Sequence, residues 1–227
     1  MISVDTVYQR VQAILNKENR GYMTPQEFNL LANQAQLEVF EQYFYDLSQF
    51  NRAGEITNEY ANIISNIKEK ISIFQKTTSL TYSNSLFSLP SDLYRLGTVY
   101  YNGTTEVEGI NQNEYLNINS SPLTKPSTTV PVYIRTGDAI TIYPSTITSN
   151  VNCSYVKTPA IADWTYVTID NVAKYDSSTV TNFELHGADE TTIVYKILSF
   201  AGLVIKQPEI STVADNKDTI KKQQEKS

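Results

Sequence analysis

The feature that most constrains this chain is a strong helix start followed by a long apolar pattern. Thr24-Pro25-Gln26-Glu27 places a capping threonine, a proline at the first helical position and a glutamate three residues after the cap. Apolar residues then recur at helical spacing in two lines, which are Leu31, Ala35, Val39, Tyr43 and Phe50, and Leu30, Leu37, Phe40, Phe44 and Leu47. Because this apolar face is wide, we expect one long helix, ending near Phe50, that is covered on more than one side.

The rest of this predicted helix is rich in uncharged amides. They are Asn29, Asn33, Gln34, Gln36 and Gln42. Such a face suits either a packed hydrogen-bonded seam or a surface that meets another subunit. The candidates for an inter-subunit seam are Asn29, Asn33, Gln36 and Tyr43.

Amphipathic patterns predict two further helices in residues 1–77. One runs from about Val4 to Leu15, and the other from about Tyr60 to Phe74. Residues 1–77 therefore read as an N-terminal helical part.

Residues 78–182 change in composition to Ser, Thr, Tyr, Val and Gly, and we expect an inserted β domain there. Asn102-Gly103 and Gly137-Asp138 are hairpin signals, and 166–169 is expected to pair with 172–175 about Asp170-Asn171. Short strands at this spacing indicate an antiparallel sandwich or a small barrel.

Residues 183–227 are expected to hold a buried helix that returns to the helical part, followed by a polar tail from Asp215. The predicted fold class is therefore α+β: a helical bundle with an inserted antiparallel β-sandwich or barrel-like domain. Lys217, Lys221 and Lys222 are candidates for docking the tail on a partner. The tail has three readings, which are docking on an acidic partner ring, contact with DNA phosphates, and a solvated helix of mixed charge.

Residues 16–27 match the spacing of an EF-hand calcium loop, in which Asn16, Glu18 and Glu27 would be ligands. The fifth position is Arg20, where an oxygen ligand is needed, and the first is a neutral asparagine. Gly21 and Glu27 are already explained by a turn and by the capping box. We therefore expect no metal here, and no cofactor elsewhere.

The composition offers little for catalysis. The chain has one histidine, His186, and one cysteine, Cys153, which lies in an apolar alternation typical of a buried strand. Glycine-rich phosphate loops are absent, and cysteine and histidine are too few for a zinc site. A hydrolase that uses only carboxylates stays open. We expect a protein that is not an enzyme.

The net charge of −6 argues against a general nucleic-acid binder, which needs a basic patch to neutralise phosphates. The N-terminus shows no secretory leader, and no apolar run reaches the length of a membrane span. We expect a protein made in a cytoplasm, with no membrane partner.

Several stretches in chain order resemble virion structural proteins of tailed bacteriophages. The likeness is to the head-to-tail connector (adaptor) ring proteins of crAss-like and related short-tailed phages, and the layout is similar to the tail tubular protein A class. The stretches are GYMTPQEFNLLANQAQLEVFEQYF (21–44), LPSDLYRL (89–96), VPVYIRTGDAITIYP (130–144), YVKTP (155–159) with Trp164, and FEL (183–185) with ETTIVYKILSFAGLVIKQPEI (190–210).

This resemblance implies a ring, of twelve copies, mounted under a portal protein at the head–tail junction of a virion. The ring would surround genomic DNA without binding it sequence-specifically. Its C-terminal segment would reach the portal, and its β domain would meet the next tail protein. The alternatives are a receptor- or glycan-binding tail component and a stopper or gatekeeper ring.

Overall fold

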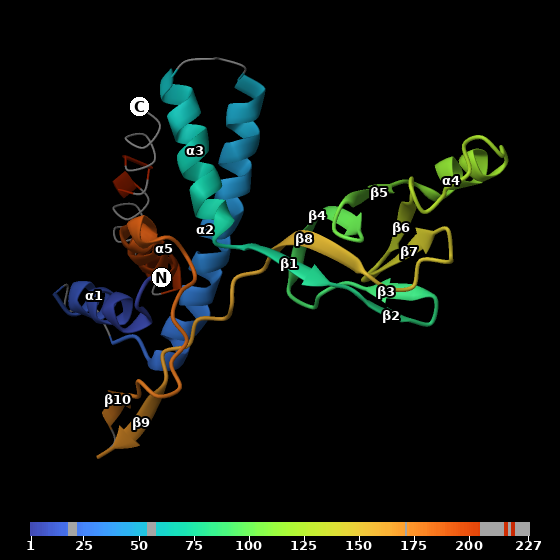
Figure 1. The fold of residues 1–227 in the computed structure, drawn as a ribbon. Coiled ribbons are helices and arrows are strands. Elements are labelled where there is room, and N and C mark those ends of the chain that lie inside the picture. Colours follow the sequence, from blue (N-terminus) through green and yellow to red (C-terminus); the bar gives the residue numbers. More distant parts are fainter. Residues whose placement is uncertain (18–21, 54–57, 171, 205–215, 218, 221–227) are drawn as a thin grey trace. The chain divides into compact units, whose positions relative to one another are not determined.

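The computed structural model describes residues 1–17, 22–53, 58–170, 172–204, 216–217 and 219–220, and the chain is mixed α+β (Figure 1). It divides into two compact units. Unit 1 comprises Met1–Ile73 and Pro159–Ser227, and unit 2 comprises Phe74–Thr158. The β domain expected over 78–182 therefore ends early, because the chain after Thr158 belongs with the helices.

The helices of unit 1 are α1 (Val4–Lys17), α2 (Pro25–Ala53), α3 (Asn58–Ser72) and α5 (Glu190–Val204), with the 3₁₀ turn η1 (Gly187–Asp189) leading into α5. Within this unit, α2 packs against α3 and α5, and α1 packs against α5 (Figure 1). The side chains between them are buried and mostly aliphatic or aromatic. They include Val4, Val7, Val11, Phe28, Val39, Phe40, Ile193 and Ile197.

The predicted capping box at the start of α2 is confirmed. The backbone N–H of Thr24 donates to Glu27 Oε2 over 2.9 Å, and the Thr24 hydroxyl donates to the same oxygen over 2.8 Å. The backbone N–H of Glu27 donates to Thr24 Oγ1 over 3.3 Å. Two N–H groups that have no partner inside the helix are thus satisfied by side chains, which fixes where α2 begins.

Unit 2 is built on a sheet of eight strands that runs in the order β1-β8-β4-β5-β6-β7-β3-β2. The strands are β1 (Gln75–Ser79), β2 (Thr81–Ser83), β3 (Leu86–Ser88), β4 (Leu93–Tyr101), β5 (Thr105–Gly109), β6 (Val132–Thr136), β7 (Ala139–Tyr143) and β8 (Val151–Lys157). The two edge strands, β1 and β2, are separated in sequence only by Leu80. The sheet therefore curls until its edges meet, as a nearly closed barrel does.

Pairing in this sheet is antiparallel except between β5 and β6, where Glu108 lies opposite Val132 in a parallel pair. A parallel pair needs a crossover, and α4 (Gln112–Asn119) lies in it. The predicted turn between β4 and β5 is confirmed, since Asn102 and Gly103 have φ values of 49° and 79°. The hairpin of β6 and β7 turns at Gly137, also as predicted.

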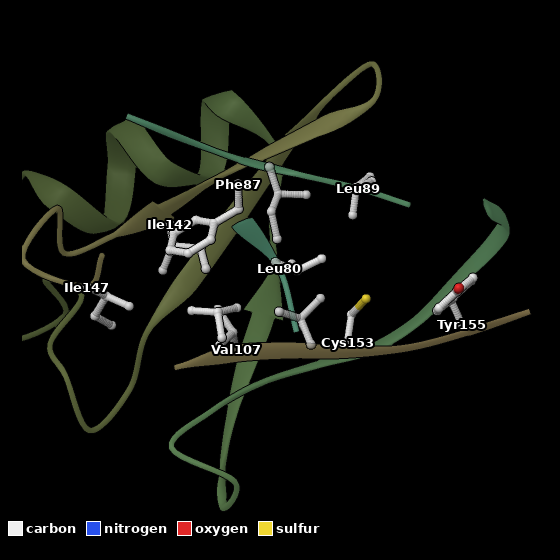
Figure 2. Close-up of a cluster of buried hydrophobic side chains, with 11 residues drawn as sticks. Leu80, Phe87, Leu89, Val107, Ile142, Ile147, Cys153 and Tyr155 are labelled. Carbon is white, nitrogen blue, oxygen red and sulfur yellow. The ribbon is translucent and has the colours of Figure 1, made fainter. Parts of the chain in front are cut away.

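The core of unit 2 fills the interior of the curled sheet. Figure 2 shows Leu80 in the same cluster of buried side chains as Val107 and Cys153. Leu80 is the single residue between the two edge strands, and its N–H donates to the carbonyl of Val151 over 2.8 Å. The meeting point of the two edges is thus held both by a backbone hydrogen bond and by apolar burial.

A separate two-stranded sheet belongs to unit 1. It consists of β9 (Tyr166–Ile169) and β10 (Val172–Tyr175), which pair antiparallel. The predicted pairing of these two segments is confirmed, but their place in the β domain is not, because they lie in the unit of the helices.

Candidate functional site

The amide side chains of α2 form hydrogen bonds to the backbone of residues 160–164, which we call the strap. Asn33 donates through Nδ2 to the carbonyl of Ala162 and accepts at Oδ1 from the N–H of Ala162, both over 2.8 Å. Asn29 accepts from the N–H of Trp164 over 2.9 Å and donates to its carbonyl over 3.3 Å. Gln36 donates to the carbonyl of Ala160 over 2.7 Å.

The helical spacing of Asn29, Asn33 and Gln36 explains why their amides fit the backbone of the strap. Positions 29, 33 and 36 lie on one side of a helix and rise by about 6 and 4.5 Å, while alternate residues of an extended strand are about 6.6 Å apart. One side of α2 therefore offers amide groups to the strap much as a neighbouring strand would. The other edge of the strap pairs with backbone, since Asp163 and Thr181 exchange N–H···O bonds of 3.0 and 3.1 Å.

This pairing corrects the predicted inter-subunit seam. The amides of Asn29, Asn33 and Gln36 are engaged within the chain, and Gln36 is only 3% exposed. Of the two readings of the amide face, the packed hydrogen-bonded seam is the one that describes these side chains. The fourth candidate, Tyr43, is also buried.

Tyr43 belongs to a buried polar cluster that joins α2, α3 and the 3₁₀ turn η1. Its hydroxyl donates to Asp189 Oδ2 over 2.7 Å, and Lys70 Nζ lies 3.0 Å from Asp189 Oδ1. The Lys70 ammonium also lies 5.6 Å from the centre of the Tyr43 ring. Asp189 is 3% exposed, so these partners take the place of solvent around its carboxylate.

A cavity of about 380 Å³ adjoins this cluster. Its wall combines apolar side chains of α2 and α3, such as Phe50 and Ile67, with polar groups at the start of α5. Both lysines in the wall are in ion pairs, Lys70 with Asp189 and Lys196 with Glu38 over 2.9 Å. The two ammonium groups therefore act in holding the helices together, and do not form an open anion site.

Trp164, at the end of the strap, organises an aromatic cluster. Its ring stacks on Tyr8 of α1 with 4.1 Å between centroids, and on Tyr166 and Tyr175 of the β9–β10 hairpin at 5.9 and 5.8 Å. The indole N–H donates to Asp5 Oδ1 over 2.9 Å. Burial raises the pKa of the Tyr8 hydroxyl, so Tyr8 stays neutral in this packing.

Two apolar surfaces of unit 1 remain uncovered by the described residues. On α2, Leu30 and Leu37 are 72% and 43% exposed, and Glu41 continues their line, which we call the outer line of α2. On the hairpin, Val167, Ile169 and Val172 are 51%, 46% and 58% exposed. The prediction that this helix is covered on more than one side is confirmed, since α2 packs against both α3 and α5 and Phe40 is fully buried, but Leu30 and Leu37 of the same apolar line are left exposed.

The two residues considered for nucleophilic chemistry have structural roles. Cys153 is fully buried in unit 2, and burial raises the pKa of its thiol to about 11. His186, in unit 1, caps η1, because its Nδ1 accepts from the N–H of Ala188 over 3.2 Å. The prediction that Cys153 lies in a buried strand is confirmed.

The EF-hand-like loop is described only in part. Asn16 is exposed in the last turn of α1, and the Glu27 carboxylate is engaged by Thr24, whereas Glu18, Arg20 and Gly21 lie outside the described residues. Within the described part of the chain, no group of three or more His, Cys, Asp or Glu side chains is placed to hold a metal ion.

The tail candidates are also described only in part. Lys217 Nζ lies 5.7 Å from the centre of the Tyr195 ring, while Lys221 and Lys222 fall outside the described residues.

In the described ranges, none of the helices has the length and apolar character needed to cross a membrane. Neither a protein-family model nor a curated protein sequence matches this chain.

Proposed function

We propose that this chain is a structural virion protein that forms a homo-oligomeric head-to-tail connector ring below a portal. The observation that carries the proposal is the uncovered outer line of α2, a long helix that is otherwise tightly held in unit 1. Large apolar side chains exposed along one side of a rigid helix are typical of surfaces that bind another protein.

The outer line of α2 is the better candidate for subunit contact because the amide face of the same helix is already occupied within the chain. Since Asn29, Asn33 and Gln36 bond to the strap, and Tyr43 to Asp189, the face they occupy is filled from within the chain. The outer line lies elsewhere on α2 and has no such partner among the described residues. Copies of the chain would pack through it, with the α2 helices of the ring arranged around a channel.

A mechanical function agrees with how the polar residues of unit 1 are used. The strap amides, the Tyr43–Lys70–Asp189 cluster and the His186 cap all hold elements together. The proposed mechanism is templated assembly of a sealed conduit at the head–tail junction, assembled in the host cytoplasm, with no catalytic turnover. The net charge of −6 favours passage of DNA without sequence-specific binding.

The remaining contacts of the ring follow from the same proposal. Unit 2, with its nearly closed barrel and inserted crossover helix α4, would meet the next tail protein. The C-terminal tail, with Lys217, Lys221 and Lys222, would dock on the portal. Deleting residues 215–227 is expected to abolish portal attachment while leaving the fold of unit 1 unchanged by circular dichroism; unchanged attachment would exclude this docking role.

Electron microscopy of the purified protein mixed with its portal tests the proposal. Closed rings on the tail-side face of the portal are expected. The Leu37→Asp variant, which places a charge on the outer line, should fold but give few rings, whereas Leu123→Asp, a change at an exposed leucine of unit 2, should assemble as the wild type does. A monomer that ignores the portal and binds glycans would contradict the connector and identify a receptor-binding component.

A further inference from the structure

We propose that the β9–β10 hairpin of one copy seats on the outer line of α2 in the next copy. This inference rests on the proposed ring and names the two surfaces that would form its subunit contact. Both surfaces belong to unit 1, which has its own core. A contact between two different patches of the same unit is heterologous, and such contacts generate rings when the rotation closes.

The hairpin presents two faces of different character. Tyr166 and Tyr175 lie opposite each other and stack on Trp164, so this inner face is held by the helical unit. The pairs Ile169–Val172 and Val167–Lys174 alternate with the first and form the outer face. Three exposed aliphatic side chains and one lysine thus point away from Trp164.

A free-standing two-stranded hairpin is only marginally stable in water, and it is usually covered by further strands or by a helix. Among the described residues, the cover comes from one side, through the stacked aromatic rings. The outer face therefore needs an apolar partner, and a second copy of the same chain can supply one.

Charge complementarity selects the partner. Lys174 on the hairpin and Glu41 on α2 are both exposed, and within the described residues neither side chain forms an ion pair or a hydrogen bond. Each lies beside exposed aliphatic residues of its own surface. Bringing the two surfaces together would bury the aliphatic groups and pair the two charges at the edge of the contact.

The spacing along the two surfaces also matches. On α2, Leu37 and Glu41 are one turn apart, about 6 Å along the axis. On the hairpin, the Val167–Lys174 pair and the Ile169–Val172 pair are two residues apart, about 7 Å. When Lys174 meets Glu41, the side chains of Ile169 and Val172 therefore fall over Leu37.

Pairing between two hairpins is the competing arrangement. It would join the same aliphatic residues, but it would place Lys174 of both copies in one small face without an acid between them. The repulsion of like charges disfavours it, whereas contact with α2 supplies the missing carboxylate.

A charge exchange tests the contact on the full chain. Glu41→Lys and Lys174→Glu, each alone, should reduce the ring fraction by about tenfold, and the double variant should restore it. Glu106→Lys, a charge reversal on an exposed strand residue of unit 2, is the control and should assemble as the wild type does. Single variants that assemble normally, or a double variant that fails to recover, would overturn the contact.

Cysteine pairing gives a second, independent readout, because the native Cys153 is fully buried. An oxidised mixture of the separate variants Leu37→Cys and Val172→Cys should give cross-linked dimers that contain one copy of each. Dimers formed by Val172→Cys alone would show hairpin–hairpin pairing and overturn the inference. Wild-type rings on the portal together with no mixed cross-link would refute this contact but not the connector, whereas absence of wild-type rings would refute both.

Discussion

Asn33 pairs with Ala162 as one strand residue pairs with another, by donating to its carbonyl and accepting from its N–H at the same distance of 2.8 Å. The two residues are 129 positions apart. The pair fixes the chain that follows unit 2 onto α2, and with it Trp164 and the hairpin. The surface we assign to subunit contact therefore depends on a side-chain amide inside unit 1.

Replacing Asn33 by leucine should destabilise unit 1. Asn33→Leu keeps the approximate shape but leaves the N–H and the carbonyl of Ala162 without a partner, which should cost about 2–3 kcal/mol of unfolding free energy. Trp164 is the only tryptophan in the sequence and lies in the strap, so denaturant unfolding followed by its fluorescence reports on this unit.

The matched control for this prediction is Gln34→Leu. Gln34 is the next residue on the same helix, and it is exposed. Its replacement should change the unfolding free energy by no more than about 0.5 kcal/mol. Equal losses in the two variants would show that the strap pairing contributes nothing specific.

The buried cluster at Asp189 should contribute measurably to the free energy of unfolding. Tyr43→Phe removes one hydrogen bond to the carboxylate and should cost about 1–2 kcal/mol, while Asp189→Ala removes the carboxylate that both Tyr43 and Lys70 contact and should cost about 3 kcal/mol or more. Tyr45→Phe, at an exposed tyrosine of the same helix, is the control and should be nearly neutral. Thermal and denaturant unfolding of the three variants would measure these losses of unfolding free energy.

The capping box should contribute a pH-dependent part of the stability. The pKa of Glu27 lies below its ordinary value because the N–H of Thr24, and then its hydroxyl, donate to the carboxylate. The stabilisation is therefore fully present above the ordinary pKa of a glutamate and is lost as the pH falls through the lower, folded-state pKa. Between about pH 5 and pH 3, the wild type should lose more stability than Glu27→Gln, which caps without titrating. Parallel losses would exclude this role.

Cys153 should be inert in the folded protein. Full burial and a thiol pKa of about 11 leave little thiolate at neutral pH, so a disulfide reagent should label it at least about a hundredfold more slowly than the free amino acid. Labelling should become fast in denaturant. Leu123→Cys, which adds a thiol at an exposed position, should react at once through the new group. Rapid labelling of the native wild type would contradict the burial.

Local signals in the sequence predicted local structure well. The capping box of Thr24 and Glu27 and the turn at Asn102-Gly103 are set by residues within a few positions of each other, and both form as expected. Strand β1, in contrast, was not predicted. Its sequence, Gln75–Ser79, has no apolar residue, and it is a strand because β8 pairs with it.

Contacts between residues far apart in the sequence could not be predicted from the sequence. The helical spacing of Asn29, Asn33 and Gln36 indicates one face, but it does not say whether the partner is another subunit or a segment more than 120 residues away. The hairpin of β9 and β10 carries the pattern of a strand pair, so its pairing was predictable. Its unit was not, because that depends on the stacking of Trp164 on Tyr166 and Tyr175.

The most direct test of the central claim is the mass of the assembled protein in solution, measured by native mass spectrometry with and without the portal. We expect one closed species to which this chain contributes a whole multiple of 25.6 kDa, the rest of the mass of a portal-bound species being that of the portal; this species should be lost in Leu37→Asp and retained in Leu123→Asp. A protein that stays at 25.6 kDa at every concentration, with the portal present, would contradict the connector ring.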